Sequence, residues 1–262
     1  MTVIDVANVS KRYALHRRRQ LIVQHALKTV RREREEFWAL RDISLSVKEG
    51  ESVALIGHNG AGKSTLLSLI VGVTAPSGGT IHTVGRIGSL LELGTGFQPE
   101  LTARENIFLC GSLLGFRRVE LEARFDEIVR FSELERFLDE PIRTFSTGMV
   151  ARLGFAVAVH RDPDILVLDE VFSVGDQNFQ KKCVAKIGEF RARGKTLLFV
   201  SHQMDSVISA CGRAIWLDHG RLRMDGPVEE VAQAYRAASP TIAAAASPRQ
   251  HAAAFPGARG RP

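Results

Sequence analysis

The chain has 262 residues, 45% hydrophobic and 24% charged, so it is long enough to bury a full core without disulfide bonds. Its three cysteines are odd in number and widely spaced, which excludes a disulfide-rich secreted scaffold and favours a reducing compartment. No apolar run reaches the roughly 18 residues of a membrane-spanning helix, and the N-terminal segment lacks the long apolar stretch of a signal peptide. We therefore expect the chain to remain in the cytoplasm.

The formal net charge of +6 is concentrated in one segment. Residues 11–36 hold nine Lys or Arg and three Glu, a local excess of +6, so the remainder is balanced. A nucleic-acid binder more often carries its charge on the folded body, so we expect no nucleic-acid partner. The segment also has an apolar stripe with helical spacing, flanked by basic residues. Such a helix suits a membrane surface, a partner or an anionic lipid-linked substrate, or it packs on its own domain.

In chain order, the apolar patterns predict strands at 3–9 and 43–47, on either side of this basic insertion. A buried strand is expected at 53–56, and short strands and turns are expected within 78–93.

Helical spacing follows over 105–138 and is broken by Pro141, and another helix begins at Gly148. Buried strands at 165–168 and 197–200 are separated by a helical segment around 179–193. Strands that alternate with helices in this way indicate an α/β fold with a mainly parallel sheet. After Tyr235 the sequence becomes rich in Ala and Pro without a sustained pattern, so we expect a disordered tail over 237–262.

The strand at 53–56 runs directly into a glycine-rich phosphate-binding loop, GHNGAGKST, which is followed by a helical pattern. Glycines allow backbone N–H groups to point at phosphate oxygens, the lysine supplies a positive charge to the β and γ phosphates, and the serine offers a hydroxyl to Mg²⁺. The predicted ATP-binding residues here are Gly57, His58, Asn59, Gly60, Ala61, Gly62, Lys63, Ser64 and Thr65.

A second part of an ATPase site lies in the sequence DILVLDE, residues 164–170. Its apolar residues predict a buried strand. Asp169 at the end of that strand can hold the Mg²⁺ coordination shell, and Glu170 can orient or deprotonate the attacking water.

Two further motifs complete a family pattern. FSTGM at residues 145–149 stands directly before a helix, and His202 follows an apolar strand. Together with the P-loop and Glu170, these motifs resemble the ATP-binding cassette family over about residues 3–235. In that family a signature loop of one subunit presses on the γ-phosphate held by the P-loop of the other. Thr147 and Met149 depart from the commonest form of this loop, but a hydroxyl and N–H groups at a helix N-terminus still make an anion site.

The resemblance implies several site residues and partners. Ser146, Thr147 and Gly148 match the signature loop, Asp176 matches the D-loop, and His202 matches the switch histidine that senses the γ-phosphate. It also implies ATP and Mg²⁺, a head-to-tail pair of two copies, and a separate integral-membrane permease. The fold implied is a P-loop NTPase domain over 1–236. It has an antiparallel β subdomain, a helical subdomain at about 105–150, and the basic insertion at 11–36.

The particular residues in these motifs resemble one branch of the family more than the others. FSTGMVARLGFAVA and DEVFSVGDQNFQKKC look like the ATPase subunits of exporters for O-antigen, capsular polysaccharide and teichoic acid. This implies a peripheral subunit at the cytoplasmic face of the inner membrane that drives export of a lipid-linked glycan, with residues 11–36 as a contact for that glycan. The alternatives are an exporter of drugs or lipids, or a soluble cassette ATPase that acts on ribosomes or RNA. The family's soluble members usually carry two cassettes or long coiled-coil arms, and neither is found in this sequence.

For two positions expected from the family pattern, a glutamine and an aromatic residue, this sequence offers more than one candidate. The glutamine expected in the loop that contacts nucleotide and permease falls at Leu93, so Glu92 is our choice for a polar substitute at the metal, with Gln98 as the alternative. An aromatic platform for adenine is expected at Tyr13, and Phe37 or Trp38 competes for that role.

Overall fold

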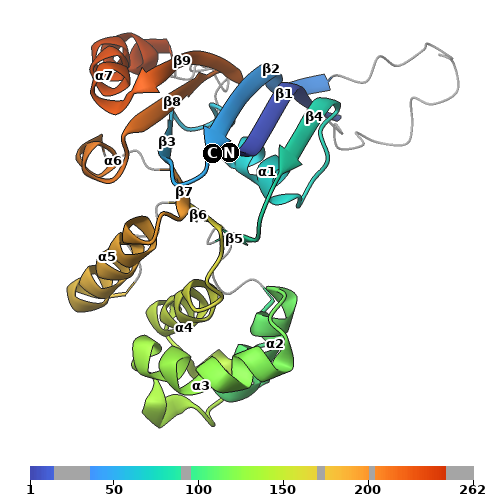
Figure 1. Ribbon diagram of the computed structural model, residues 1–262, viewed down its shortest axis with the longest axis vertical. Helices are drawn as coiled ribbons and strands as arrows, with labels where there is room; N and C mark the ends of the chain where they lie inside the picture. Colours follow the sequence, from blue (N-terminus) through green and yellow to red (C-terminus); the bar gives the residue numbers. More distant parts are fainter. Residues whose placement is uncertain (15–35, 90–95, 170–174, 201–203, 246–262) are drawn as a thin grey trace, which may run out of the picture.

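The computed structural model describes residues 1–14, 36–89, 96–169, 175–200 and 204–245 (Figure 1). The strands are β1 (Thr2–Ala14), β2 (Glu36–Lys48), β3 (Ser52–Ile56), β4 (Gly78–Thr83), β5 (Ile87–Ser89), β6 (Ile165–Asp169), β7 (Thr196–Val200), β8 (Arg213–Asp218) and β9 (Arg221–Pro227). The α-helices are α1 (Lys63–Val71), α2 (Ala103–Leu113), α3 (Arg118–Ser132), α4 (Thr147–Val159), α5 (Gln177–Ala192), α6 (Met204–Ala210) and α7 (Val228–Ala245).

The larger sheet has the strand order β5-β6-β7-β3-β8-β9. Its strands are parallel except β9, which pairs with β8 as an antiparallel hairpin. Successive side chains of a strand point to opposite faces, so Leu55 joins a core with helix α1 while Ala54 and Ile56 join a second core with α5. Burial on both faces explains why the central strands are almost continuously apolar.

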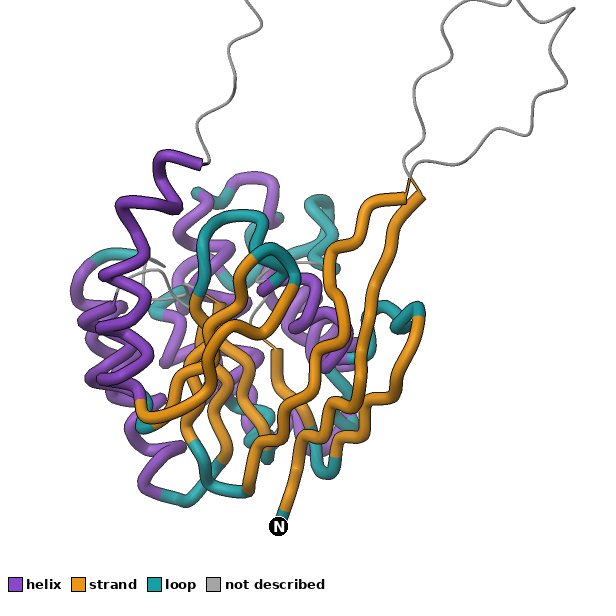
Figure 2. The backbone as a smooth tube through the Cα atoms, turned by 90° about the horizontal axis from the view of Figure 1, so that it is seen from above, coloured by secondary structure: helices purple, strands orange, loops and turns teal. Residues whose placement is uncertain are grey.

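A smaller antiparallel sheet, in the order β2-β1-β4, covers α1. The hairpin of β1 and β2 is long, and Figure 2 shows its tip projecting beyond the rest of the described chain. Tyr13 and Phe37 pair near this tip, and Thr2 pairs with Lys48 at the opposite end.

Helices α2, α3 and α4 form a separate group below the sheets in Figure 1. Helix α4 belongs to two cores, because Leu153 and Val157 pack with α2 and α3 whereas Phe155 and Val159 pack with the main sheet and α5. A helix that is buried on both sides links any movement of the helical group to the main sheet.

The fold class predicted from the sequence is confirmed: a mainly parallel sheet is accompanied by an antiparallel sheet and a helical group. The helical stretch at 105–138 is two helices, because the chain turns at Gly115, where φ is +82°. No helix in the described ranges is long and apolar enough to cross a membrane.

Helix α7 runs from Val228 to Ala245 and so extends past residue 236, where the predicted domain ends. Val228, Val231 and Ala232 bury one face of this helix, and alanine favours continuation of a helix once it is anchored. Residues 246–262 of the predicted tail, and residues 15–35 of the basic insertion, lie outside the described ranges.

Candidate functional site

Three glycines shape the P-loop between strand β3 and helix α1. Gly57, Gly60 and Gly62 have φ of 151°, 83° and 104°, values that other residues rarely adopt. A Cβ on Gly57 would lie 2.3 Å from the carbonyl oxygen of Leu217, whereas a Cβ on Gly60 would meet no atom within 4 Å. The loop therefore packs tightly against β8 and is open at Gly60, where a phosphate can approach the backbone.

A cavity of about 230 Å³ opens on this loop. The N-terminus of α1 carries neither an acidic residue in its first turn nor a side-chain cap, so its N–H groups are suited to an anion. The cavity is lined by Phe37, Ala39, Asn59, Gly60, Gly62, Lys63, Ser64 and Thr65.

The side chain of Lys63 is buried, and its ammonium group is fixed by two backbone carbonyl groups of the loop. Its Nζ donates to the carbonyl oxygens of Gly57 at 2.6 Å and His58 at 3.1 Å. The fixed positive charge of Lys63 suits a phosphate chain, and the hydroxyl of the exposed Ser64 beside it suits an oxygen-bound Mg²⁺.

Two of the predicted ATP-binding residues face away from this cavity. The His58 ring lies 4.7 Å from the ring of His219 in the β8–β9 turn. Ala61 is buried, and its carbonyl oxygen accepts a hydrogen bond from Gly220 N–H at 3.0 Å. These residues can contribute to phosphate binding through their backbone only.

The three aromatic candidates divide between the two faces of the β1–β2 hairpin. Tyr13 pairs with Phe37 in the ladder, so both rings project from the face that carries the phosphate cavity. Trp38 projects from the other face, where the guanidinium carbons of Arg12 and Arg41 lie 5.8 Å and 5.7 Å from its ring centroid. Tyr13 and Phe37 are 42% and 51% exposed, as a base-stacking surface requires. Lys11 Nζ lies 5.1 Å from the centroid of the Tyr13 ring, so it is the face of the hairpin, and not a nearby cation, that separates Tyr13 from Trp38.

The carboxyl edge of the parallel sheet carries the second predicted motif. Strands β6, β7 and β3 are neighbours, and they end at Asp169, Val200 and Ile56 on one edge. The backbone of Asp169 pairs with Val200. Glu92, Glu170 and His202 lie outside the described residues, so their assignments remain predictions.

The signature loop opens on a different cavity, of about 630 Å³. Ser146 is the N-cap of α4, and its Oγ accepts from Met149 N–H at 3.2 Å. The hydroxyl proton can still be donated to a phosphate oxygen. The same cavity is lined by Glu133, Leu134, Phe137, Ser146, Thr147, Gly148, Met149, Ala151, Arg152, Gly175 and Asp176, so the signature and D-loop residues meet here.

Asp176 is fixed in this cavity by two kinds of contact. Its carboxylate caps α5 by accepting from the N–H groups of Asn178 and Phe179, and it pairs with the guanidinium of Arg152. The hydrogen bond from Phe179 N–H, with the charge of Arg152, lowers the pKa of this exposed carboxyl group.

Arg152 is a site residue that the sequence analysis missed. Its side chain is only 18% exposed and joins Asp176 of the D-loop to Glu133 at the end of α3. The sequence does contain a feature that could have identified it, because Arg152 is the single charged residue among the 13 residues of α4. A lone charge on an otherwise apolar helix normally requires partners.

The phosphate cavity and the signature cavity share no lining residue. The first lies at the N-terminus of α1 and the second at the N-terminus of α4, and Figure 1 shows these helices in separate parts of the molecule. Gln98, the alternative for the nucleotide-contacting glutamine, is exposed, and its N–H donates to the buried Asn106 side chain. The signature cavity and the phosphate cavity are therefore separate within one copy of the chain.

Comparison with known proteins gives one family and several similar sequences. The family model described as "ABC transporter" matches residues 40–173. The O-antigen export system ATP-binding protein RfbB of Klebsiella pneumoniae is 47% identical over 241 residues, which are 90% of this chain and 98% of RfbB. The teichoic acids export ATP-binding protein TagH of Listeria monocytogenes is 43% identical over 232 residues, covering 88% of this chain and 69% of TagH.

Solved structures are similar in fold. An ATP-binding subunit of an ABC transporter has a TM-score of 0.70 and 25% identity, covering 89% of this chain and 93% of that chain. A dimeric bacterial ABC transporter cassette has a TM-score of 0.67 and 25% identity, covering 86% of this chain and 98% of the other.

Proposed function

Because this chain belongs to the ABC transporter family, we propose that it is the ATP-hydrolysing subunit of an exporter for a lipid-linked polysaccharide, O-antigen or a related glycan, across the inner membrane. The observation that carries the proposal is the 47% identity to an O-antigen export ATP-binding protein along 90% of the chain. The subunit would work at the cytoplasmic face of that membrane with a separate permease.

ATP would bind with its phosphates in the cavity on the P-loop. The N–H groups at the start of α1 and the ammonium of Lys63 would hold the β and γ phosphates, and adenine would stack on Tyr13 and Phe37. Mg²⁺ would neutralise developing phosphate charge, and the Ser64 hydroxyl with Asp169 and Glu92 would hold it. Glu170 would act on the attacking water as a general base, and His202 would hold the γ-phosphate.

The site is complete only when two copies pair head to tail. One copy would bring its P-loop, and the other would bring Ser146, Gly148 and Asp176 against the γ-phosphate. The support is that the two cavities are disjoint within one chain while each has half of the groups required. A dimer is also the assembly of a similar bacterial cassette. Hydrolysis would weaken the contact to the signature loop, and the two copies would separate.

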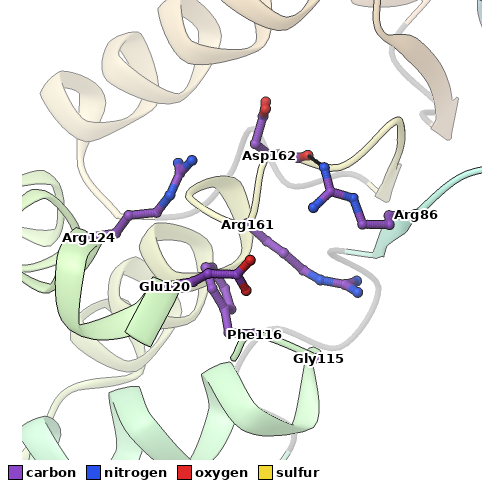
Figure 3. Close-up of a pocket in the computed structure, with 7 residues that line it drawn as sticks. All are labelled: Arg86, Gly115, Phe116, Glu120, Arg124, Arg161 and Asp162. Carbon is purple, nitrogen blue, oxygen red and sulfur yellow. Dashed lines mark hydrogen bonds between the residues drawn. The ribbon is translucent and has the colours of Figure 1, made fainter. Parts of the chain in front are cut away.

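A permease contact is best supported at the junction of the helical group and the core. A cavity of about 80 Å³ there is lined by Arg86, Gly115, Phe116, Glu120, Arg124, Arg161 and Asp162. Figure 3 shows Arg86 and Arg161 reaching this space from the core side and Glu120 from α3. Burial, with a smaller contribution from the neighbouring charge of Arg86, lowers the pKa of Arg161. Three arginines and two carboxylates line the cavity, so its lining is slightly basic.

Two exposed apolar side chains lie in the helices next to this cavity, Leu113 at 66% and Val119 at 75% exposure. Exposed apolar side chains near a cavity lined by three arginines and two carboxylates suit a partner segment with acidic or carbonyl groups. Because the cavity joins residues of both parts of the molecule, a segment bound there would respond to their relative movement.

The basic insertion remains our candidate for contact with the anionic end of the glycan carrier. Residues 15–35 hold seven Lys or Arg and two Glu. At the base of the insertion the charges are already paired, because Arg12 Nη1 lies 3.0 Å from Glu36 Oε2. The residues we propose for this contact are Arg17, Arg18 and Arg19, since arginine pairs bidentately with phosphate.

The proposal is tested with Glu170→Gln in the native exporter. Loss of the general base should lower ATP hydrolysis by about 10²- to 10⁴-fold while ATP binding is retained. Polymer should then disappear from the cell surface and accumulate inside as its lipid-linked form. Glu122→Gln, at an exposed carboxylate of α3, is the matched control and should export normally. Normal surface polymer in a Glu170→Gln strain, despite absent hydrolysis, would refute the assignment to this exporter.

A further inference from the structure

Three side chains with metal-binding chemistry meet behind the P-loop, on the side away from the phosphate cavity. His58 is the second residue of the loop, Asp218 ends strand β8, and His219 begins the turn to β9. One ligand atom from each lies within 4.8 Å of the others. From this arrangement we propose that His58, Asp218 and His219 bind a divalent transition-metal cation of the Zn²⁺ type.

The hydrogen bonding of His58 fixes which ring nitrogen is available. Its Nδ1 lies 2.7 Å from the carbonyl oxygen of Asn59. A carbonyl oxygen only accepts, so Nδ1 carries the proton and donates it. In the neutral ring Nε2 then has a free lone pair. A metal-bound histidine usually donates its other ring N–H to a backbone carbonyl or carboxylate, as His58 does here to Asn59.

That lone pair is directed at a carboxylate. His58 Nε2 lies 3.2 Å from Asp218 Oδ1, yet within the described part of the chain both atoms are buried and have no hydrogen-bond partner. Two buried acceptors this close repel each other unless a cation lies between them. In a tetrahedral zinc site, with bonds of about 2.0–2.2 Å, ligand atoms stand about 3.3 Å apart. The observed spacing suits such an ion.

His219 supplies the third donor and separates a metal site from a simple ion pair. Its Nε2 lies 3.8 Å from the same Asp218 oxygen, and its side chain is 75% exposed, so the ring can rotate toward the ion. A single proton between His58 and Asp218 would leave this second imidazole without a role. Two nitrogen donors and one carboxylate favour Zn²⁺ over Mg²⁺ or Ca²⁺.

The supporting contacts hold the ligands in place. Asp218 Oδ2 pairs with Arg223 Nη1 at 3.2 Å, which leaves Oδ1 for the ion. In the turn, Gly220 N–H donates to Ala61 at 3.0 Å and Gly220 accepts from Arg41 N–H at 2.8 Å. The P-loop and the turn are therefore already joined, and a bound ion would clamp them further. The nearby Arg223 charge will weaken the site, and three protein ligands leave a position for water.

The test uses the full chain, freed of metal with EDTA and then dialysed. Co²⁺ serves as the spectroscopic probe and Zn²⁺ as the ligand in thermal unfolding. The wild type should show the visible absorption of four-coordinate Co²⁺, and Zn²⁺ should raise its melting temperature. Asp218→Asn and His219→Gln should each weaken binding by more than about tenfold and lose the Zn²⁺-dependent shift.

Two matched control variants test whether the metal binds at another place on the protein. Asp205→Asn and His82→Gln change an acid and a histidine that are exposed on α6 and β4, and both should behave as wild type. Unchanged melting temperatures of all variants in EDTA would show that they fold. The proposal is overturned if wild type binds no Co²⁺. It is also overturned if Asp218→Asn and His219→Gln retain the wild-type spectrum and Zn²⁺ affinity, because the ion would then lie elsewhere.

Discussion

Tyr13 of β1 lies directly opposite Phe37 of β2, and Phe37 lines the cavity on the P-loop. Residues opposite each other in an antiparallel ladder share a face, so the two rings form one aromatic surface beside the phosphate site. The next pair, Arg12 and Trp38, faces the other way. The strand register alone therefore places Tyr13 and Phe37 on one face of the hairpin and Trp38 on the other.

This arrangement predicts that Tyr13→Ala and Phe37→Ala each weaken ATP binding. Base stacking on an aromatic ring is worth about 1–3 kcal/mol, or about 5- to 150-fold in the dissociation constant. Tyr13→Phe and Phe37→Tyr should bind normally, because the ring is retained. Trp38→Ala is the matched control, and its ATP affinity, measured by nucleotide titration, should equal that of wild type. A large loss of affinity in Trp38→Ala alone would contradict the assignment.

Replacement of Arg152 should affect both the fold and the composite site. The side chain is largely buried and bridges Glu133 and Asp176, so Arg152→Ala removes the cation paired with Asp176 and leaves Glu133 with Lys182 alone. We expect a loss of about 1–3 kcal/mol in the free energy of unfolding, measured with urea, and reduced ATPase activity. Arg118→Ala removes an exposed arginine that is paired with Glu122, and it should change neither quantity.

The close approach of the β8–β9 turn to strand β2 gives a backbone prediction. A Cβ on Gly220 would lie 2.6 Å from the carbonyl oxygen of Ala39, and its φ is +74°. Gly194 has a similar φ of +71°, but a Cβ there would meet nothing within 4 Å. Gly194→Ala should cost about 1 kcal/mol from backbone strain only. Gly220→Ala should cost clearly more and also weaken ATP binding, and equal melting temperatures would argue against this contact.

The three cysteines should be unreactive in the folded protein. Burial raises the pKa of Cys183 and Cys211 to about 12 and that of Cys110 to about 11. Almost no thiolate is then present at pH 8, so a disulfide reagent should label the native chain slowly and the urea-unfolded chain at all three sites. These thiols favour the folded state below their unfolded pKa of about 8.5, and that contribution is lost as pH rises toward 12. Rapid native labelling at pH 8 would contradict their burial.

Much of the fold could be predicted because its signals are local. The strand, loop and helix around Lys63, and the apolar strand that ends at Asp169, are each contained in a short stretch of sequence. The division of 105–138 into α2 and α3 was missed, although Gly115 is the residue at which the chain turns. The extension of α7 was missed because its anchor, the buried face at Val231 and Ala232, depends on tertiary packing.

The rest of the site depends on pairing between distant segments. The hairpin of β8 and β9 was not predicted, although Asp-His-Gly between apolar runs is a turn signal. Its contact with Ala61 and Ala39 follows only from the strand order. Likewise, the basic insertion separates Tyr13 from Phe37 in the sequence, so their pairing cannot be read from a local pattern. The roles of Glu92, Glu170 and His202 remain predictions from the sequence.

The central claim is that each ATP site combines the P-loop of one copy with the signature loop of another. It is tested by the ATPase activity of Lys63→Ala subunits mixed with Ser146→Arg subunits. Each variant alone should be nearly inactive, but their heterodimer contains one site in which both halves are intact, so the mixture should regain hydrolysis. Wild type mixed with the Lys63→Ala/Ser146→Arg double variant forms no additional intact site and should gain nothing over wild type alone. A mixture of the two folded single variants that stays as inactive as its components would contradict the composite site.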